Sequence, residues 1–390
     1  MKIHRVRNTA LGLTGLVPLI LAILACTSFS PDDTKVLYPA FSGANGAVGF
    51  ASYDRKSKRS ELVFVSANLE GAETNDSGPN PLRAQWLGDG HRILATWTVG
   101  RQEDLLNLAV FPFDAHGAVQ LFSLPGKELS KSVMLPAPIV GDRAFLIDTP
   151  NQVARLDLRD GTVVHHPLGE EGSDWLLYPA ADGQSVFYLE DRKSQGDYCF
   201  GRLDPQSFAL TTLLTFTNRL ESGFSFTYDG PGNRLVFVEK AEAGPRLVVL
   251  ERGKPAWTRP LSTPGGHLEL GNLVISRGGD LLLASFRRTK EGSSVSAFGL
   301  IEIPLREGSA RETVLIPACK VADESAAAYF QFGVSHDGKT AAVASTYLAC
   351  VSQEFKGEDC ALFLVDLSGP NRKVTKVPIA LPSRRATSAN

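Results

Sequence analysis

The chain has 390 residues, of which 43% are hydrophobic and 21% are charged, and its mean hydropathy of −0.04 is close to neutral. This composition excludes a disordered chain, a collagen-like repeat and a membrane protein with many spans. The formal net charge of −2 provides no positive surface of the kind that binds nucleic acid, so we expect no nucleic-acid partner.

The first 26 residues have the pattern of a secretory signal. Lys2, Arg5 and Arg7 precede an uncharged stretch, whose aliphatic core from Leu16 to Leu24 is too short to span a bilayer comfortably. The stretch ends in Ile23-Leu24-Ala25-Cys26, which resembles the bacterial lipobox. That resemblance implies cleavage before Cys26, acylation of its thiol and of the freed amine, and anchoring of the mature chain by lipid. An ordinary signal peptide with a chance cysteine is the alternative.

The residues after the signal predict a short tether. Residues 1–25 would be removed, and the polar sequence of residues 26–35 is typical of a flexible segment. The lipobox resemblance also brings a sorting rule, in which Asp after the cysteine retains a lipoprotein in the inner membrane. Thr27 therefore favours the outer membrane, facing the periplasm. Loss of the signal removes three positive and no negative charges, which leaves a mildly acidic mature chain of net charge −5.

One pattern repeats from residue 36 to residue 381. An apolar run, a turn of Gly with Asp or Asn, and further apolar runs separated by polar loops recur about every 49 residues. The clearest copy runs from Phe332 to Ser345 and continues from Ala361 to Leu367. Such turns between apolar runs are strong hairpin signals, because Gly and Asn tolerate positive φ. The seven turns that we identify are Asn45-Gly46, Asp89-Gly90, Gly141-Asp142, Asp182-Gly183, Asp229-Gly230, Gly279-Asp280 and Asp337-Gly338.

Repeats of about 40 to 50 residues with four short strands are typical of β-propeller blades. No stretch has a sustained helical period, and runs such as Leu247 to Leu250 are continuously apolar, as expected for sheets packed on both faces. The sequence therefore predicts an all-β fold, a single propeller of seven four-stranded blades over residues 36–381, with a disordered tail at 382–390. Residues 71–81 offer no clear fourth strand for the first blade, and a ring of six or eight blades is the alternative.

The seventh unit also resembles a known family. Ser335-His336-Asp337-Gly338, the run that continues to Ser345, and the later Leu364-Val365-Asp366-Leu367 look like the repeat of TolB-type propellers, the periplasmic component of the Tol-Pal system and its relatives. The match is partial in the fourth and fifth units. The resemblance implies the propeller fold and the periplasmic compartment, but the repeat motif names no ligand.

Four cysteines remain besides Cys26, and an even number of thiols in an exported chain favours disulfides. Cys350 and Cys360 bracket a polar loop of the seventh unit, where the separation across two strands could suit a bridge. Cys319 and Cys199 are expected on or near the same face of the ring. Pairing of Cys319 with Cys350 or Cys360 is therefore the rival arrangement.

The predicted ring has two different faces. One, the long-loop face, holds the loops between second and third strands and the links between blades; the other, the turn face, holds the tight Asp-Gly turns. Because binding residues concentrate on loops carried by a rigid scaffold, we expect the partner site on the long-loop face. Two cationic runs are candidates to meet an acidic partner or lipid head groups, against the alternative of turns charged only for solvation. They are Arg55, Lys56, Lys58 and Arg59, and Arg287, Arg288 and Lys290.

The sequence lacks the usual catalytic motifs. It has no Gly-x-Ser-x-Gly, no His-Glu-x-x-His and no P-loop. His165 and His166 are adjacent, so in a strand they point to opposite faces, and Asp157, Asp204 and Asp366 resemble turn-stabilising residues at strand ends. We therefore predict no catalytic residue, no cofactor and no metal site.

Two functions are consistent with these observations. The first is a monomeric, lipid-anchored, non-catalytic propeller that binds or scaffolds an envelope protein or cell-wall component. The second is an enzyme of the lactonase or glycan-lyase type with its site in the central channel. The second requires several inward His, Asp or Glu side chains on the innermost strands, and the runs expected there supply almost none.

Overall fold

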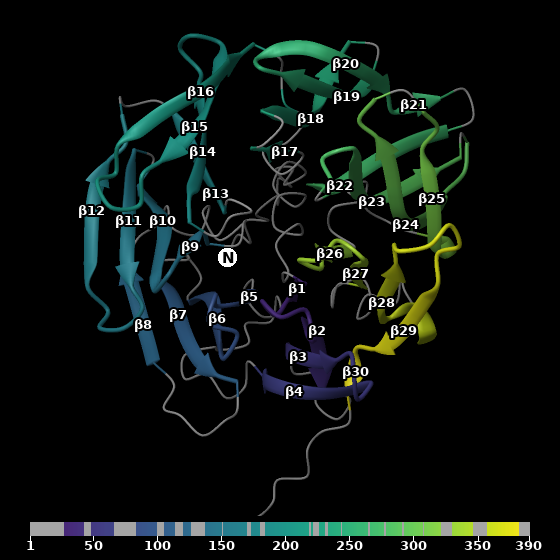
Figure 1. Ribbon diagram of the computed structural model, residues 1–390, viewed down its shortest axis with the longest axis horizontal. Helices are drawn as coiled ribbons and strands as arrows, with labels where there is room; N and C mark the ends of the chain where they lie inside the picture. The colour runs from purple at the N-terminus through teal and green to yellow at the C-terminus, as the bar shows by residue number, and fades with distance from the viewer. Residues whose placement is uncertain are drawn as a thin grey trace, which may run out of the picture.

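The fold is a seven-bladed β-propeller, as predicted (Figure 1). Seven antiparallel sheets, most of them four-stranded, surround a central axis. In most sheets the strands run outward from the axis in chain order, as β13 (Asp174–Pro179) to β16 (Leu210–Phe216) and β17 (Phe226–Asp229) to β20 (Lys254–Pro260) do. The computed structural model describes residues 27–42, 48–65, 83–99, 105–113, 120–125, 137–149, 151–169, 173–179, 184–217, 220, 226–230, 233–242, 244–263, 266–276, 278–290, 292–306, 308–320, 330–345 and 357–381.

The strands follow one another blade by blade around the ring. Blades 1 and 2 consist of β1 (Ser28–Phe29), β2 (Lys35–Ser42), β3 (Val48–Asp54) and β4 (Arg59–Val65), and of β5 (Arg83–Trp86), β6 (Arg92–Val99), β7 (Leu105–Pro112) and β8 (Gln120–Pro125). Blades 3 and 4 consist of β9 (Ile139–Val140), β10 (Arg143–Thr149), β11 (Gln152–Asp157) and β12 (Val163–Pro167), and of β13 (Asp174–Pro179), β14 (Val186–Arg192), β15 (Asp197–Leu203) and β16 (Leu210–Phe216).

The second half of the ring repeats the arrangement. Blade 5 consists of β17 (Phe226–Asp229), β18 (Arg234–Ala241), β19 (Gly244–Glu251) and β20 (Lys254–Pro260). Blade 6 has the short β21 (Ser262–Thr263) before β22 (Gly266–Ile275), β23 (Leu281–Thr289), β24 (Val295–Pro304) and β25 (Arg311–Lys320). Blade 7 consists of β26 (Phe330–Val334), β27 (Thr340–Ser345), β28 (Ala361–Asp366) and β29 (Val374–Pro378), and the final β30 (Ala380–Leu381) returns to blade 1.

The core lies in the seams between neighbouring blades. Every residue of β27 is buried, and five of the six residues of β28 are, because each sheet packs on a neighbour through both faces. Between blades 6 and 7, Phe298 and Leu300 pack against Val343 and Phe363, all of them at 0% exposure. The continuous apolar runs of the sequence thus become strands covered from two sides.

The structure corrects where blade 1 begins and which of its strands comes first. Residues 28–35, expected as part of a tether, form β1, the first turn and the start of β2. The turn has the same hydrogen bonds as the clearest repeat: Ser30 N donates to Lys35 O at 3.0 Å, and Ser335 N donates to Thr340 O at 2.9 Å. The predicted turn Asn45-Gly46 falls between β2 and β3, outside the described residues.

The first turn was not predicted from the sequence because this turn contains no glycine. Gly338 occupies the left-handed position of the seventh turn with φ 72°, whereas Asp33 occupies the equivalent position with φ 58°. Asp and Asn tolerate this conformation better than other side-chain-bearing residues do. Ser30-Pro31-Asp32-Asp33 therefore does not match the pattern of a Gly-containing turn, whereas Asn45-Gly46 does.

Both ends of the described chain close the ring on the inner edge of β2. Near the turn face, β1 pairs with β2 in antiparallel fashion, with Ser28 opposite Leu37. Near the long-loop face, β30 pairs with β2 in parallel, with Ala380 opposite Phe41 and Leu381 opposite Ser42. Figure 1 shows β30 beside blade 1, where the C-terminal part of the chain meets the N-terminal part.

Candidate partner-binding surface

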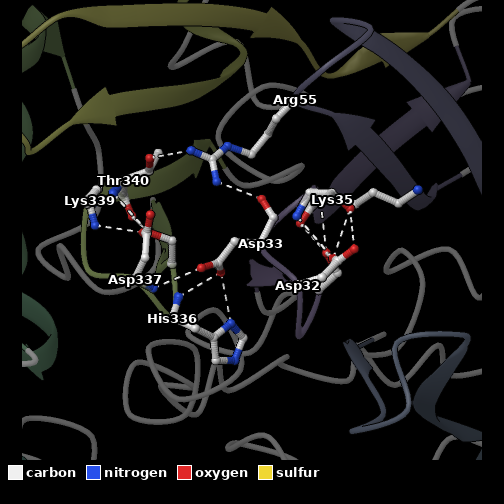
Figure 2. Close-up of polar contacts among 11 residues, drawn as sticks. Asp32, Asp33, Lys35, Arg55, His336, Asp337, Lys339 and Thr340 are labelled. Carbon is white, nitrogen blue, oxygen red and sulfur yellow. Dashed lines mark hydrogen bonds and ion pairs between the residues drawn. The ribbon is translucent and has the colours of Figure 1, made fainter.

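A clasp of polar side chains joins blades 1 and 7 on the turn face (Figure 2). The carboxylate of Asp33 accepts hydrogen bonds from the backbone N–H of His336 at 2.7 Å and of Asp337 at 2.9 Å. The Nδ1 of His336 lies 2.9 Å from the same carboxylate. Asp33 thus links the first turn of the ring to the last.

Arg55 is the second part of the clasp. It follows β3, and its Nη1 donates to the backbone oxygen of Asp33 at 2.7 Å. Its Nη2 donates to the hydroxyl of Thr340 in blade 7, also at 2.7 Å. The guanidinium carbon lies 5.6 Å from the centre of the Phe29 ring. Arg55 therefore joins blade 1 to blade 7 through both terminal nitrogens of its guanidinium.

The rest of this run forms a rigid, exposed turn. The carboxylate of Asp54 accepts hydrogen bonds from the N–H of Lys56 at 3.0 Å and of Ser57 at 2.7 Å, and the Ser57 bond leads the interactions that lower the pKa of Asp54. Lys58 N donates to Asp54 O at 2.9 Å. Lys56, Lys58 and Arg59 are exposed. We call residues 55–59 the cationic turn.

The cationic turn lies on the turn face, and its predicted place on the long-loop face is wrong. It joins β3 to β4, the third and fourth strands of blade 1. Connections of this kind share a face with the turns between first and second strands, as the bonds of Arg55 to Asp33 and Thr340 show. The error arises because β1 was not predicted. One additional strand at the start of blade 1 moves every later connection of that blade to the opposite face.

A hollow of about 400 Å³ lies beside the cationic turn, between blades 1 and 2. Lys35 links the two, because its ammonium lies 3.7 Å from the Asp54 carboxylate and 5.1 Å from the centre of the Phe113 ring. Asp32 also lines the hollow, and the hydroxyl of Ser30, 2.6 Å away, is the main reason why its pKa falls to about 2. His91 and Glu61 also line the hollow.

The second predicted cationic run lies on the long-loop side and is largely paired. Arg287 is 7% exposed, donates to the Ser296 hydroxyl at 3.0 Å and lies 3.7 Å from the Glu269 carboxylate. Arg288 forms an ion pair with Glu312. Lys290, the last cation of the run, is an exposed residue of the loop after β23. The two cationic runs are therefore not brought together.

Arg288 also lines a hollow of about 300 Å³ between blades 5 and 6. Its walls include Arg259 and His267, which belong to no motif by which the sequence could reveal them. The apolar side of the hollow is formed by Leu268 and Ile301.

The cysteines are only partly as predicted. Cys360 is disulfide-bonded, whereas Cys199 and Cys319 are buried free thiols. Cys199 lies in blade 4, with its sulfur 3.3 Å from the Thr212 hydroxyl, and Cys319 packs in the core between blades 6 and 7. The rival pairing through Cys319 is therefore not formed. Cys350 and Cys26 lie outside the described residues.

One feature of a metalloenzyme site, a group of metal ligands, is absent from the part of the chain that the structure describes. No group of three or more His, Cys, Asp or Glu side chains there is placed to hold a metal ion. His165 and His166 are consecutive in β12, and the ring of His166 stacks on Phe208 with 4.8 Å between centres. No helix among these residues is long and apolar enough to cross a membrane.

Comparison with known proteins identifies the fold and no more. No family and no curated protein matches the sequence. A candidate 6-phosphogluconolactonase of Bacteroides fragilis aligns with 90% of this chain and 96% of its own, with a TM-score of 0.52 and 10% identity. The C-terminal WD40 domain of Sif2 aligns with 88% of this chain and 81% of its own, with a TM-score of 0.43 and 14% identity. The seven sheets and the likeness to the lactonase structure make the chain a seven-bladed β-propeller protein. Its resemblance to TolB-type repeats stays a prediction.

Proposed function

We propose that the protein is a lipid-anchored, non-catalytic binding propeller of the bacterial envelope, related to TolB-type propellers, and that its cationic turn contacts an acidic envelope protein or cell-wall component. The N-terminal signal and the sequence Ile23-Leu24-Ala25-Cys26 support the anchor. The disulfide at Cys360 supports an oxidising compartment outside the cytoplasm.

The geometry of the cationic turn carries the binding proposal. Asp54 fixes its backbone, and Arg55 ties it to blade 7, so Lys56, Lys58 and Arg59 are presented from a rigid support. A surface that is already ordered loses little conformational entropy on binding. Three exposed cations in four residues attract an acidic partner and accelerate its association at low salt.

Charge reversal tests the proposal. The triple variant Lys56→Glu, Lys58→Glu and Arg59→Glu should retain at least tenfold less partner than the unmodified protein in pull-downs from solubilised envelopes. The matched control is Arg252→Glu with Lys254→Glu, in the corresponding turn between β19 and β20 of blade 5. The unmodified capture should weaken as salt rises. Equal capture by the triple variant and the control would contradict the proposal.

A propeller enzyme is the competing function. A metal-dependent lactonase or glycan lyase would hold a metal in its central channel, which elemental analysis of the purified protein detects. One tightly held metal per chain would overturn the non-catalytic function.

A further inference from the structure

The first described residues of the chain are packed into the ring. Thr27 is 4% exposed and Phe29 is 5% exposed. The backbone oxygen of Thr27 lies against the innermost strand of blade 7, where a Cβ added to Gly333 would be 2.4 Å from it. A contact this close requires glycine at position 333. The residues that follow Cys26 are therefore packed into the fold, and the tether expected from the sequence is not present between Thr27 and the first blade.

The direction of entry follows from the first turn. β1 leads directly into the turn at Ser30, and Asp33 of that turn bonds to His336 and Asp337 on the turn face (Figure 2). A strand that ends at the turn face comes from the direction of the long-loop face. Thr27 therefore lies on the long-loop side of β1, and an anchor on Cys26, one peptide bond earlier, would start from that side.

The lengths of the strands limit how far that anchor reaches. Ser28 lies opposite Leu37, and β2 continues to Ser42, which is about 17 Å further toward the long-loop face at 3.3 to 3.4 Å per residue. A mature chain that begins at Cys26 has two residues before Ser28, which reach about 7 Å. β30 already occupies the inner edge of β2 at Phe41 and Ser42. Two extended residues before Ser28 would thus cover at most about 7 Å of the roughly 17 Å that separate Leu37 from the end of β2 at Ser42.

We propose that the propeller rests with its long-loop face on the bilayer surface, so that its turn face points into the compartment. This orientation depends on the proposed lipid anchor at Cys26. Acyl chains attached to a recessed terminus enter the bilayer only when the rim around the axis meets the membrane. The same orientation presents Lys56, Lys58 and Arg59 away from the lipid, where an acidic partner has access to them.

Site-specific quenching tests the orientation in the full-length acylated protein. One reporter is a fluorophore on Ser294→Cys, an exposed residue of the long-loop face between β23 and β24; the other is on Asn371→Cys, an exposed residue of the turn face between β28 and β29. The buried thiols Cys199 and Cys319 should not react in the folded protein. The vesicles contain phosphatidylethanolamine, phosphatidylglycerol and a lipid with a nitroxide head group.

The fluorophore at position 294 should be quenched at least twofold more strongly than the one at position 371. Insertion of a 20-residue Gly/Ser linker between Cys26 and Thr27, which spans roughly 25 Å, should remove the difference. Equal or reversed quenching in the acylated protein without the linker overturns the orientation and leaves the anchor intact. Failure of Cys26 to incorporate labelled palmitate, with vesicle binding unchanged in Cys26→Ser, overturns the anchor and the orientation with it.

Discussion

Asp33 shows how one residue combines backbone strain with ring closure. In other turns between a first and a second strand, Gly90 and Gly338 occupy the left-handed position. Glycine has no side chain that could bond to a neighbouring blade. Asp33 adopts φ 58° at a cost of about 1 kcal/mol or more. Its carboxylate then accepts two backbone N–H bonds from blade 7, at 2.7 and 2.9 Å. Aspartate at this position therefore joins the two ends of the ring, which glycine could not do.

Substitution of Asp33 separates the two effects. Asp33→Ala keeps the strain and loses the clasp, so it should lower the free energy of unfolding by about 2 to 4 kcal/mol. Asp33→Gly loses the clasp but relieves the strain, and should be about 1 kcal/mol more stable than Asp33→Ala. Urea unfolding followed by tryptophan fluorescence measures both. If Asp33→Ala matches the unmodified protein, the clasp contributes nothing to stability.

At the scale of the strand, irregularities recur at the same place in several blades. The pairing of the third with the fourth strand shifts register at Phe200/Gly201 in blade 4 and at Phe298/Gly299 in blade 6. A Cβ on Gly201 would lie 2.5 Å from Thr211 O, and one on Gly299 would lie 2.1 Å from Thr313 O. Glycine is needed at both bulges because the backbones of the two strands approach closely there.

These two glycines should not tolerate alanine. Gly201→Ala and Gly299→Ala should each lower the free energy of unfolding by about 1 to 3 kcal/mol, because the neighbouring strand must move. Gly88→Ala is the matched control, since no atom lies within 4 Å of its added Cβ. Thermal unfolding should show a lower Tm for both strand variants and no loss for the control. A Tm for Gly201→Ala equal to that of Gly88→Ala would refute the packing argument.

At the scale of the whole molecule, the sequence was sufficient for the fold class and the number of blades. Apolar runs separated by turns at a regular interval predict seven sheets, because each blade is the same local unit. The count was correct although one of its turns, Asn45-Gly46, belongs to a different connection of blade 1. Counting Asn45-Gly46 gave the same number of units, because blade 1 has its own first turn, in which Asp33 stands at the position that glycine occupies in other blades.

The faces of the ring were harder to predict than the fold. Strand direction alternates, so the face of a connection depends on the parity of the strand before it, and one missed strand reverses the assignment. For this reason the cationic turn was assigned to the wrong face while Lys290 was not. The clasp of Asp33 with His336 was not visible either, because it joins residues 303 positions apart.

Carboxylates that cap turns are distributed around the ring and give it a common response to acid. The hydroxyl of Ser30 lowers the pKa of Asp32 to about 2, and the hydroxyl of Ser335 leads the interactions that lower the pKa of Asp337. In blade 3, the side chain of Arg159 lowers the pKa of Asp157 to about 2. All three carboxylates are more acidic in the folded chain than the ordinary value of 3.8.

A group whose pKa is lower in the folded state adds stability above its unfolded pKa, and this contribution disappears as pH falls through the folded value. These carboxylates should therefore make no pH-dependent contribution above pH about 5, and the free energy of unfolding should decrease between pH about 4 and about 2. Ser335→Ala, which removes the hydrogen bond to Asp337, should be less stable at neutral pH and should lose less stability on acidification. Urea midpoints measured from pH 2 to pH 7 compare the two proteins. Parallel curves for Ser335→Ala and the unmodified chain would show that the Ser335 hydroxyl does not control the titration of Asp337.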